Sequence, residues 1–322
     1  MNVATKSSRQ IALVAIFSLP FLWGPTFAIV QRVIYDITPM TYLALRLSLA
    51  GGIFLLTSKA ARRGTRILIR PQNRQERRFR QDAIITGMSL CGGYLFQTIG
   101  LLTTTTSKSA FLTSTTVVLT PLLTWLLGKD RITYNIILAV IVIIIGIFLM
   151  TQPFRGEGIV IGDVLTLGCA ISWSFYIISL DWAMPRTLKL VANEHEASLM
   201  FTSSTIIVSA LLFWIFLPML ETPHLNITPF SVTALFYTVI FTTCLTTYLQ
   251  THYQHQVSAT VAAIIYMLEP VAVIFIAALV LAERIGLLEL LGGSLILLGV
   301  IISQMKFSFR SSIVQGIIET SD

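Results

Sequence analysis

The stretch QTIGLLTTTTSKSAFLTSTTVVLTPLLTWLLGKDR, residues 97–131, decides how this chain folds, because the same chain repeats it. Residues 250–284 read QTHYQHQVSATVAAIIYMLEPVAVIFIAALVLAER, and Gln97 matches Gln250 at an offset of 153 residues that needs no gap. A copy at a fixed offset predicts an internal structural repeat. With five membrane spans in each copy, the second copy enters the membrane from the opposite side. We therefore expect an inverted-topology repeat with a binding site where its halves meet.

The composition is typical of a polytopic membrane protein. The chain is 55% hydrophobic and 11% charged, whereas a soluble domain carries about 25% charged residues. Only helices of about 20 residues satisfy their own backbone while crossing hydrocarbon at this length. We predict an all-α membrane protein with ten transmembrane helices in two inverted five-helix repeats, residues 1–154 and 155–322. The ten predicted spans are residues 11–31, 40–58, 83–103, 109–127, 132–151, 160–180, 197–217, 230–250, 258–281 and 286–305.

Lysine and arginine are distributed unequally between the two sides, which predicts the orientation. With the N-terminus in the cytoplasm, 17 basic residues fall on the cytoplasmic side and 4 on the outer side. We therefore expect a multi-pass protein of the inner or plasma membrane with both termini in the cytoplasm. The loop 59–82 holds nine of the basic residues. Because only one aromatic residue, Phe79, lies among them, the loop predicts contact with anionic lipid and not with nucleic acid.

No motif in the chain indicates a metal or a cofactor. Cys91, Cys169 and Cys244 each lie inside an apolar stretch, and their spacing forms neither a disulfide framework nor a metal site. The absence of a nucleotide-binding motif excludes an ATP-driven pump in this chain.

Matched polar residues inside spans are the first candidates for a site. Thr113 and Thr116 lie on one face of the fourth span, and their counterparts at the 153-residue offset are Tyr266 and Glu269 in the ninth. Such a set can line a cavity, or it can join helices by hydrogen bonds, because threonine also bonds to its own or a neighbouring helix.

Two aromatic and two amide residues form further matched pairs. Trp23 and Trp173 hold corresponding places in the first and sixth spans, away from the ends where an aromatic belt lies. Gln97 and Gln250 match in the third and eighth. We expect all four to be candidate cavity walls, with ordinary packing as the alternative for the tryptophans. The glycine and proline after Trp23 predict a bend in the first helix.

Two charges lie deep inside spans, where an ionisable side chain indicates function by default. Glu269 could bind a substrate amine, carry a proton, or cap backbone groups freed by Pro270. Arg46 could pair with a carboxylate or attract an anionic substrate. Alternatively, its stem is buried while its head reaches the interface.

Short motifs in a fixed order cover nearly the whole chain. They are WGPTF at 23–27, ALR at 44–46, GD at 162–163, SW at 172–173, VSAT at 257–260, LEP at 268–270, AER at 282–284, LGG at 291–293 and LG at 298–299. This series resembles the drug/metabolite transporter superfamily, and each half resembles an EamA-type repeat. The resemblance implies a central cavity between the repeats, peripheral fifth and tenth helices, and export or exchange of small metabolites. Thr116-Val117 stands where the second half has Glu269-Pro270, which leaves open whether both halves bend alike.

The function we expect is a secondary transporter, and not an enzyme, that exports or exchanges small metabolites such as amino acids or drugs by alternating access. The alternatives are a membrane-embedded lipid-modifying enzyme and a non-transporting scaffold. Proton coupling stays open, and the internal repeat allows a complete pathway in a monomer. The predicted substrate pathway consists of Trp23, Arg46, Gln97, Thr113, Thr116, Trp173, Gln250, Tyr266 and Glu269.

Overall fold

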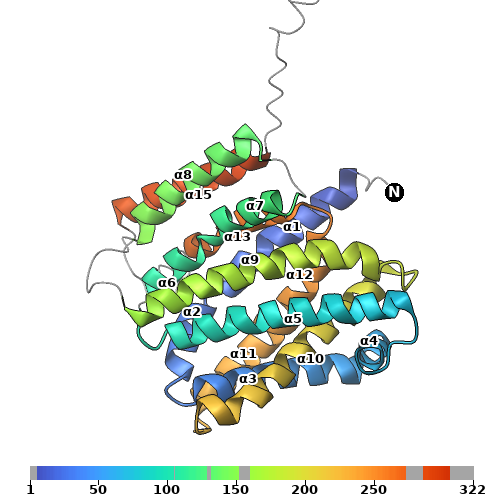
Figure 1. The fold of residues 1–322 in the computed structure, drawn as a ribbon. Helices are drawn as coiled ribbons and strands as arrows, with labels where there is room; N and C mark the ends of the chain where they lie inside the picture. Colours follow the sequence, from blue (N-terminus) through green and yellow to red (C-terminus); the bar gives the residue numbers. More distant parts are fainter. Residues whose placement is uncertain (1–5, 105, 129–131, 152–159, 273–285, 305–322) are drawn as a thin grey trace, which may run out of the picture.

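The computed structural model describes residues 6–104, 106–128, 132–151, 160–272 and 286–304, and these residues are almost entirely helical (Figure 1). Within them, the β structure is one isolated bridge between Ile37 and Leu225. The helices are α1 (Lys6–Trp23), α2 (Thr26–Val33), α3 (Pro39–Thr57), α4 (Lys59–Ile69), α5 (Arg74–Gly100), α6 (Thr106–Thr113), α7 (Thr116–Leu126), α8 (Tyr134–Thr151), α9 (Ile161–Thr187), α10 (Glu194–Leu220), α11 (Pro229–Val239), the π-helix η1 (Ile240–Leu245), α12 (Thr246–Gln254), α13 (Ala259–Tyr266) and α15 (Leu287–Gln304).

The all-α membrane class is confirmed. Five stretches are long and apolar enough to cross a bilayer, and shorter apolar helices lie in the predicted fourth, fifth, ninth and tenth spans. The end of the ninth span and the boundary between the two predicted repeats lie outside the described residues. The five longer stretches are Gln10–Val33, Pro39–Thr57, Ile161–Thr187, Glu194–Leu220 and Pro229–Gln254.

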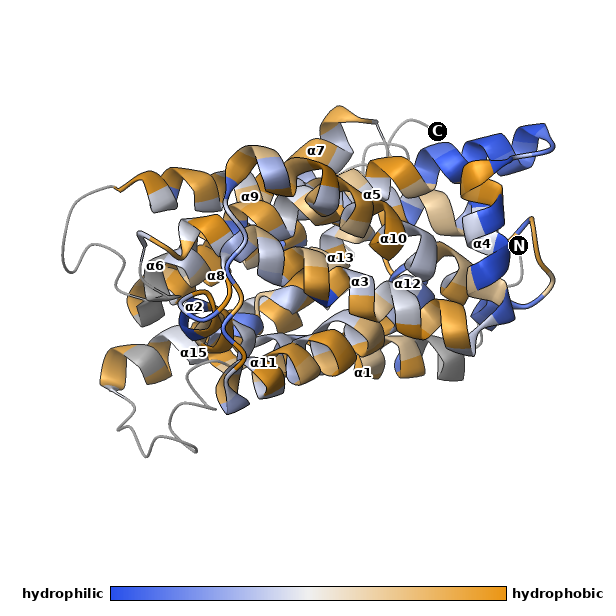
Figure 2. Ribbon diagram, turned by 90° about the horizontal axis from the view of Figure 1, so that it is seen from below, coloured by the Kyte–Doolittle hydropathy of each residue, from blue (hydrophilic) through white to orange (hydrophobic). Residues whose placement is uncertain are grey.

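The basic segment expected as a loop contains a helix, α4. Ser58 caps its first turn by accepting a hydrogen bond from the Ala61 amide at 3.3 Å. Ala61, Gly64 and Ile67 are buried and face α10, where a Cβ on Gly64 would lie 2.7 Å from the Met200 carbonyl. The helix therefore packs closely by one face and presents its basic residues at one end of the bundle, the α4 end (Figure 2).

Each main helix pair joins one repeat to the other. The most extensive contacts pair α5 with α9, α3 with α10 and α8 with α15, and further contacts pair α1 with α12 and α7 with α13. Figure 1 shows α8 and α15 side by side at the margin of the bundle. Because the halves interleave in this way, the space between them lies at the centre of the molecule.

Two glycines set the α8–α15 contact. A Cβ on Gly146 would lie 2.7 Å from the Gly292 carbonyl, and one on Gly299 would lie 3.0 Å from the Ala139 carbonyl. Gly146 and Gly299 are counterparts at the 153-residue offset, so each repeat contributes the same small residue to a close backbone approach.

The two halves bend alike, because their helices break at equivalent positions. The predicted fourth span is not one helix, since it breaks between α6 and α7 at Ser114-Thr115, and α13 ends before a turn at Met267-Leu268. The two breaks lie 153 residues apart. Pro270 follows its break and sits in the first turn of the resumed helix, where a proline is tolerated. The predicted bend at Gly24-Pro25 is also present, as the turn between α1 and α2.

Candidate functional site

A central cavity of about 710 Å³, including its opening, lies among α1, α2, α5, α6, α7, α9, α12 and α13. Eight of the nine residues predicted for the substrate pathway line it, and Arg46 does not. Its lining consists of Trp23, Thr26, Phe27, Val30, Tyr94, Gln97, Leu101, Thr113, Thr116, Trp173, Ile177, Gln250, Tyr266, Met267 and Glu269.

Aromatic rings from both repeats form opposing walls of the cavity. Trp23 meets Tyr266 edge to face with ring centroids 5.1 Å apart, and Tyr94 meets Trp173 in the same way at 5.2 Å. Gly93 makes room for the second pair, since a Cβ there would lie 2.8 Å from the Trp173 ring. Edge-to-face pairs hold both rings in defined orientations, so the walls are preformed.

Arg46 lies behind one of these walls. It is 2% exposed, and its guanidinium carbon stands 4.4 Å from the centroid of the Tyr94 ring, on α5. The Arg46 Nε donates to the Thr243 hydroxyl at 2.8 Å, and Nη2 donates to the Thr242 hydroxyl at 2.9 Å and the Tyr94 hydroxyl at 3.2 Å. Its head therefore neither reaches the interface nor pairs with a carboxylate among the described residues. It fixes Tyr94 in place instead.

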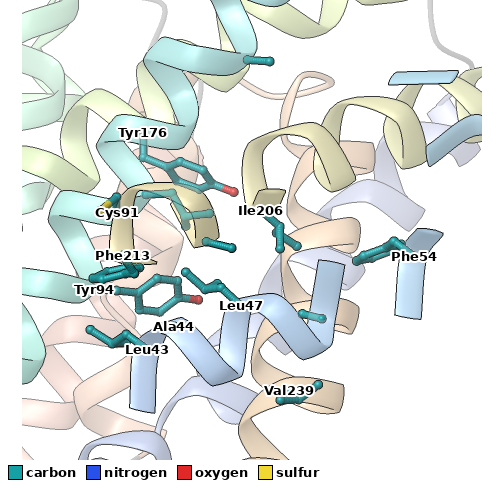
Figure 3. Packing of buried hydrophobic residues seen from close by; sticks show 14 of the residues in the cluster. Leu43, Ala44, Leu47, Phe54, Cys91, Tyr94, Tyr176, Ile206, Phe213 and Val239 are labelled. Carbon is teal, nitrogen blue, oxygen red and sulfur yellow. The ribbon is translucent and has the colours of Figure 1, made fainter. Parts of the chain in front are cut away.

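The arginine site depends on the π-helix η1. A π-helix bonds i to i+5 and often marks a functional position. Here it presents Thr242 and Thr243 together toward α3, and the Thr242 carbonyl lies 3.3 Å from the Arg46 Nη2. Figure 3 shows Tyr94 beside Leu43, Ala44 and Leu47 of α3, so the back of the wall is otherwise apolar.

A hydrogen-bond network lies behind two lining residues, Gln250 and Tyr266, at the end of the cavity nearer α4, which we call its floor. Gln254 is fully buried. Its Oε1 accepts from the Gln250 amide at 3.0 Å and from the Tyr266 hydroxyl at 3.1 Å, while its Nε2 donates to the Ile177 carbonyl at 2.8 Å. One side chain thus joins α12, α13 and α9. A buried network in which each group is satisfied fixes one arrangement.

Three polar side chains on the cavity surface have no hydrogen-bond partner among the described residues. They are the Thr26 hydroxyl, the Gln97 amide and the Glu269 carboxylate. Glu269 therefore does not cap the turn that precedes Pro270. Buried polar groups are normally paired, so these three offer hydrogen-bonding capacity to an occupant of the cavity.

The threonines on the fourth span act as both cavity lining and helix contacts. Thr116 donates to the Thr113 carbonyl at 2.7 Å and lies 3.4 Å from the Ala170 carbonyl of α9. Thr113 lies 4.0 Å from the Cys169 sulfur. Both line the cavity while joining α6 and α7 to α9, so the two interpretations of this stripe are compatible.

A second, polar cavity of about 540 Å³, including open space, lies further along α7. Its lining includes Thr124 and Thr260, whose hydroxyls are 3.4 Å apart across the α7–α13 contact. Thr120, fully buried and without a partner for its hydroxyl among the described residues, lies between Thr116 in the first cavity and Thr124 in the second. A line of hydroxyls at helical spacing thus runs from one cavity to the other.

Sequence reasoning missed two residues that complete the site. Tyr94 lies one helical turn before Gln97, and Gln254 lies one turn after Gln250. A search of the helical faces that carry the two matched glutamines could have found both. Gln254 was missed because the predicted eighth span ended at residue 250, whereas the helix continues to residue 254.

Comparison with known proteins gives one consistent result. The profile of the EamA-like transporter family matches residues 10–152 and 160–305. An uncharacterized transporter of Archaeoglobus fulgidus is 28% identical over 296 residues, covering 92% of this chain and 85% of that protein. A solved crystal structure with 14% sequence identity covers 92% of this chain and 98% of its own, with a TM-score of 0.73, and so shares the fold. The chain belongs to the EamA-like transporter family, as its motifs indicated, and is a multi-pass membrane transporter.

Proposed function

We propose that this EamA-like chain is a secondary transporter that exports or exchanges small metabolites, such as amino acids or drugs, by alternating access. One observation carries the proposal: a central cavity is lined by matched residues of two interleaved repeats. Transporters with inverted repeats bind at such an interface. Both repeats of one chain supply the lining, which supports transport by a monomer.

The orientation follows from the basic end of the bundle. Because α4 and the following segment carry the largest group of basic residues, we place the α4 end in the cytoplasm of an inner or plasma membrane. The loops at the opposite end are joined by the Asn226 amide, which donates to the Asp36 carbonyl at 2.9 Å. In this orientation Val30 and Leu101 line the outer end of the cavity, and Gln254 lies at its cytoplasmic floor.

Alternating access requires the floor to open, and the helix breaks are candidate hinges. The turns at Ser114-Thr115 and Met267-Leu268 lie at the level of the cavity, and α7 and α13 extend from these turns to the second cavity. Since α7 and α13 meet at Thr124 and Thr260, bending at both turns would connect the central cavity with the second one. The stripe from Thr116 to Thr124 then supplies hydroxyls along the route.

Transport by the purified protein tests the proposal. Metabolites that differ between cells overproducing and cells lacking the protein supply candidate substrates. Each is then assayed for counterflow into proteoliposomes preloaded with the unlabelled compound. Labelled compound that accumulates transiently without ATP supports the proposal. Candidates that bind the purified protein but show no counterflow would contradict transport and favour a scaffold.

A further inference from the structure

The charge of the central cavity is unbalanced. Among its described lining residues, Glu269 is the one ionisable acid, and no lysine, arginine or histidine accompanies it. The Glu269 side chain has no hydrogen bond or ion pair with another described residue. An ionised carboxylate inside a membrane protein is costly unless it is paired. The geometry therefore leaves a position for a positive group supplied from outside the chain.

The surrounding rings suit such a group. Trp23, Trp173 and Tyr266 present π-systems to the same cavity, and a cation within about 6 Å of a ring centroid is attracted by the negative face. Aromatic walls also favour an apolar body on the same molecule, because they bury its surface. The Thr26 hydroxyl and the Gln97 amide, which have no hydrogen-bond partner among the described residues, can bond a polar substituent.

The cation of Arg46 is kept out of the cavity. Arg46 uses Nε and Nη2 on Thr243, Thr242 and Tyr94, and its guanidinium lies over the Tyr94 ring; Tyr94 lines the cavity and Arg46 does not. It therefore offers no direct contact to an anion. Because the energy between two charges falls with distance, the attraction of a bound cation to Glu269, which it contacts, exceeds its repulsion from Arg46, which lies behind the ring.

We propose that the cavity binds molecules that carry a positively charged amino or ammonium group on an apolar body, with the charge at Glu269 and the body between the aromatic walls. This inference rests on the proposed function, since it names the substrate class of the same site. It assigns Glu269 as a binding residue, and Trp23, Trp173 and Tyr266 as residues that set specificity.

A pair of probes with the same shape and different charge tests the inference. Phenyltrimethylammonium is a permanent cation, and tert-butylbenzene is its neutral isostere. Because the quaternary nitrogen has no proton to exchange, its binding cannot be ascribed to protonation of Glu269. Binding of the labelled cation to purified protein is measured by equilibrium dialysis, and the isostere and the anion benzenesulfonate are measured as competitors.

We expect the cation to bind at least about 10-fold more tightly than the neutral isostere, and the anion not to compete. Glu269→Gln should weaken the binding of the cation at least about 10-fold, which corresponds to about 1.4 kcal/mol. The affinity of the variant for the isostere should stay unchanged. Unchanged isostere binding shows that the cavity is intact in the variant. If Glu269→Gln fails to fold, the inference is tested by the relative affinities of the wild type for the cation and the isostere. Glu269→Asp, which keeps the charge, should then still bind the cation more tightly than the isostere.

The inference is overturned if the cation and the isostere bind equally, if the cation does not bind, or if Glu269→Gln retains full cation affinity. Its failure is separate from failure of the proposed function. Cation binding without counterflow of any compound would leave the binding site standing and refute transport. Counterflow restricted to anions would establish transport and refute the assignment of substrate charge.

Discussion

The two ends of the central cavity are built from equivalent positions of the repeat but from opposite chemistry. Leu101 lines the outer end, and its counterpart at the 153-residue offset is Gln254, which lies at the floor. Contacts of Leu101 are apolar and have no required direction. Gln254 makes three hydrogen bonds that join three helices. The contacts of Leu101 can therefore part without leaving polar groups unpaired, whereas those of Gln254 cannot.

This difference indicates which helices move. α5 and α9 are joined at both ends, by Thr104 with Asp163 at the outer end and by Arg186 with Asp82, 2.8 Å apart, at the α4 end. A pair held at both ends is expected to stay together while access changes. The floor would then open by movement of α12, α13 and α7, which meet the α5–α9 pair through Gln254 and the threonine stripe.

Filling the space between the two ends of the cavity should have the largest effect on transport. Thr113→Trp places an indole in the cavity beside Trp173, so neither end would lead to a usable site. We expect transport of an identified substrate to fall below detection while the protein remains folded. Counterflow in proteoliposomes measures this, with thermal unfolding in detergent as the check on folding.

Thr233→Trp is the matched control, because Thr233 is exposed on α11 away from the cavity. This variant should transport like the wild type. Normal transport by a folded Thr113→Trp variant would remove the cavity from the pathway and with it the comparison of its two ends.

Converting the floor into the chemistry of the outer end should have the next largest effect. Gln254→Leu leaves the Gln250 amide and the Tyr266 hydroxyl without their acceptor, at about 1–3 kcal/mol for each buried group left unsatisfied, while the Ile177 carbonyl keeps its bond within α9. The closed floor should lose stability, so the cavity should open toward the α4 end. We expect a Gln97→Cys reporter to react about 10-fold faster with an impermeant thiol reagent in inside-out vesicles.

Gln72→Leu controls for the loss of a glutamine, since Gln72 is exposed and outside the bundle. Cys91, Cys169 and Cys244 are replaced in all variants so that only the reporter reacts. A reaction rate in Gln254→Leu equal to that of the control would show that the network does not hold the floor closed.

Much of this architecture follows from the sequence, because hydrophobic length and the repeat offset report on long segments. The breaks at Ser114-Thr115 and at the π-helix do not. No glycine or proline marks them, and the hydroxyls of Ser114 and Thr115 instead bond back to the Ala110 and Leu112 carbonyls at 2.7 and 2.6 Å. Such bonds compete with regular helix, but threonine is too common in membrane helices for this to be predicted locally.

The location of Arg46 was unpredictable for a similar reason. The sequence places a cation within a span, but only the packing of α3 against η1 brings the Thr242 and Thr243 hydroxyls to it. A π-helix rotates the residues that follow it relative to an α-helical register, so helical spacing alone points these threonines elsewhere. The matched pairs were easier to place because the two residues of each pair hold equivalent positions in the two repeats.

The reciprocal exchange at the outer end should have a smaller effect. Leu101→Gln introduces an amide at the position equivalent to Gln254, close to Gln97, whose own amide has no hydrogen-bond partner among the described residues. A new bond between two partly hydrated amides is worth about 0.5–1.5 kcal/mol. We expect the Gln97→Cys reporter to be unsuitable here, and a Thr113→Cys reporter to react several-fold more slowly from the outer side. Faster reaction would mean that the outer end does not close by the chemistry seen at the floor.

Releasing the α5–α9 pair at the α4 end should have the smallest effect. Arg186 is half exposed, so its bond to Asp82 contributes less than about 1 kcal/mol, and Asp82→Asn should transport normally. Burial raises the pKa of the Asp82 carboxyl above its ordinary 3.8, and Arg186 offsets only part of this shift.

The pH dependence of this variant has a defined sign. Because the folded protein holds the Asp82 proton more tightly than the unfolded chain, the contribution of Asp82 to stability falls as pH rises through its raised pKa. Asparagine does not titrate. The stability of the wild type relative to Asp82→Asn should therefore increase as pH is lowered from 7 toward 4, measured by thermal unfolding in detergent. A relative stability that decreases over this range would mean that the ion pair outweighs burial, and that α5 and α9 are held at the floor by charge as firmly as Gln254 holds its three helices.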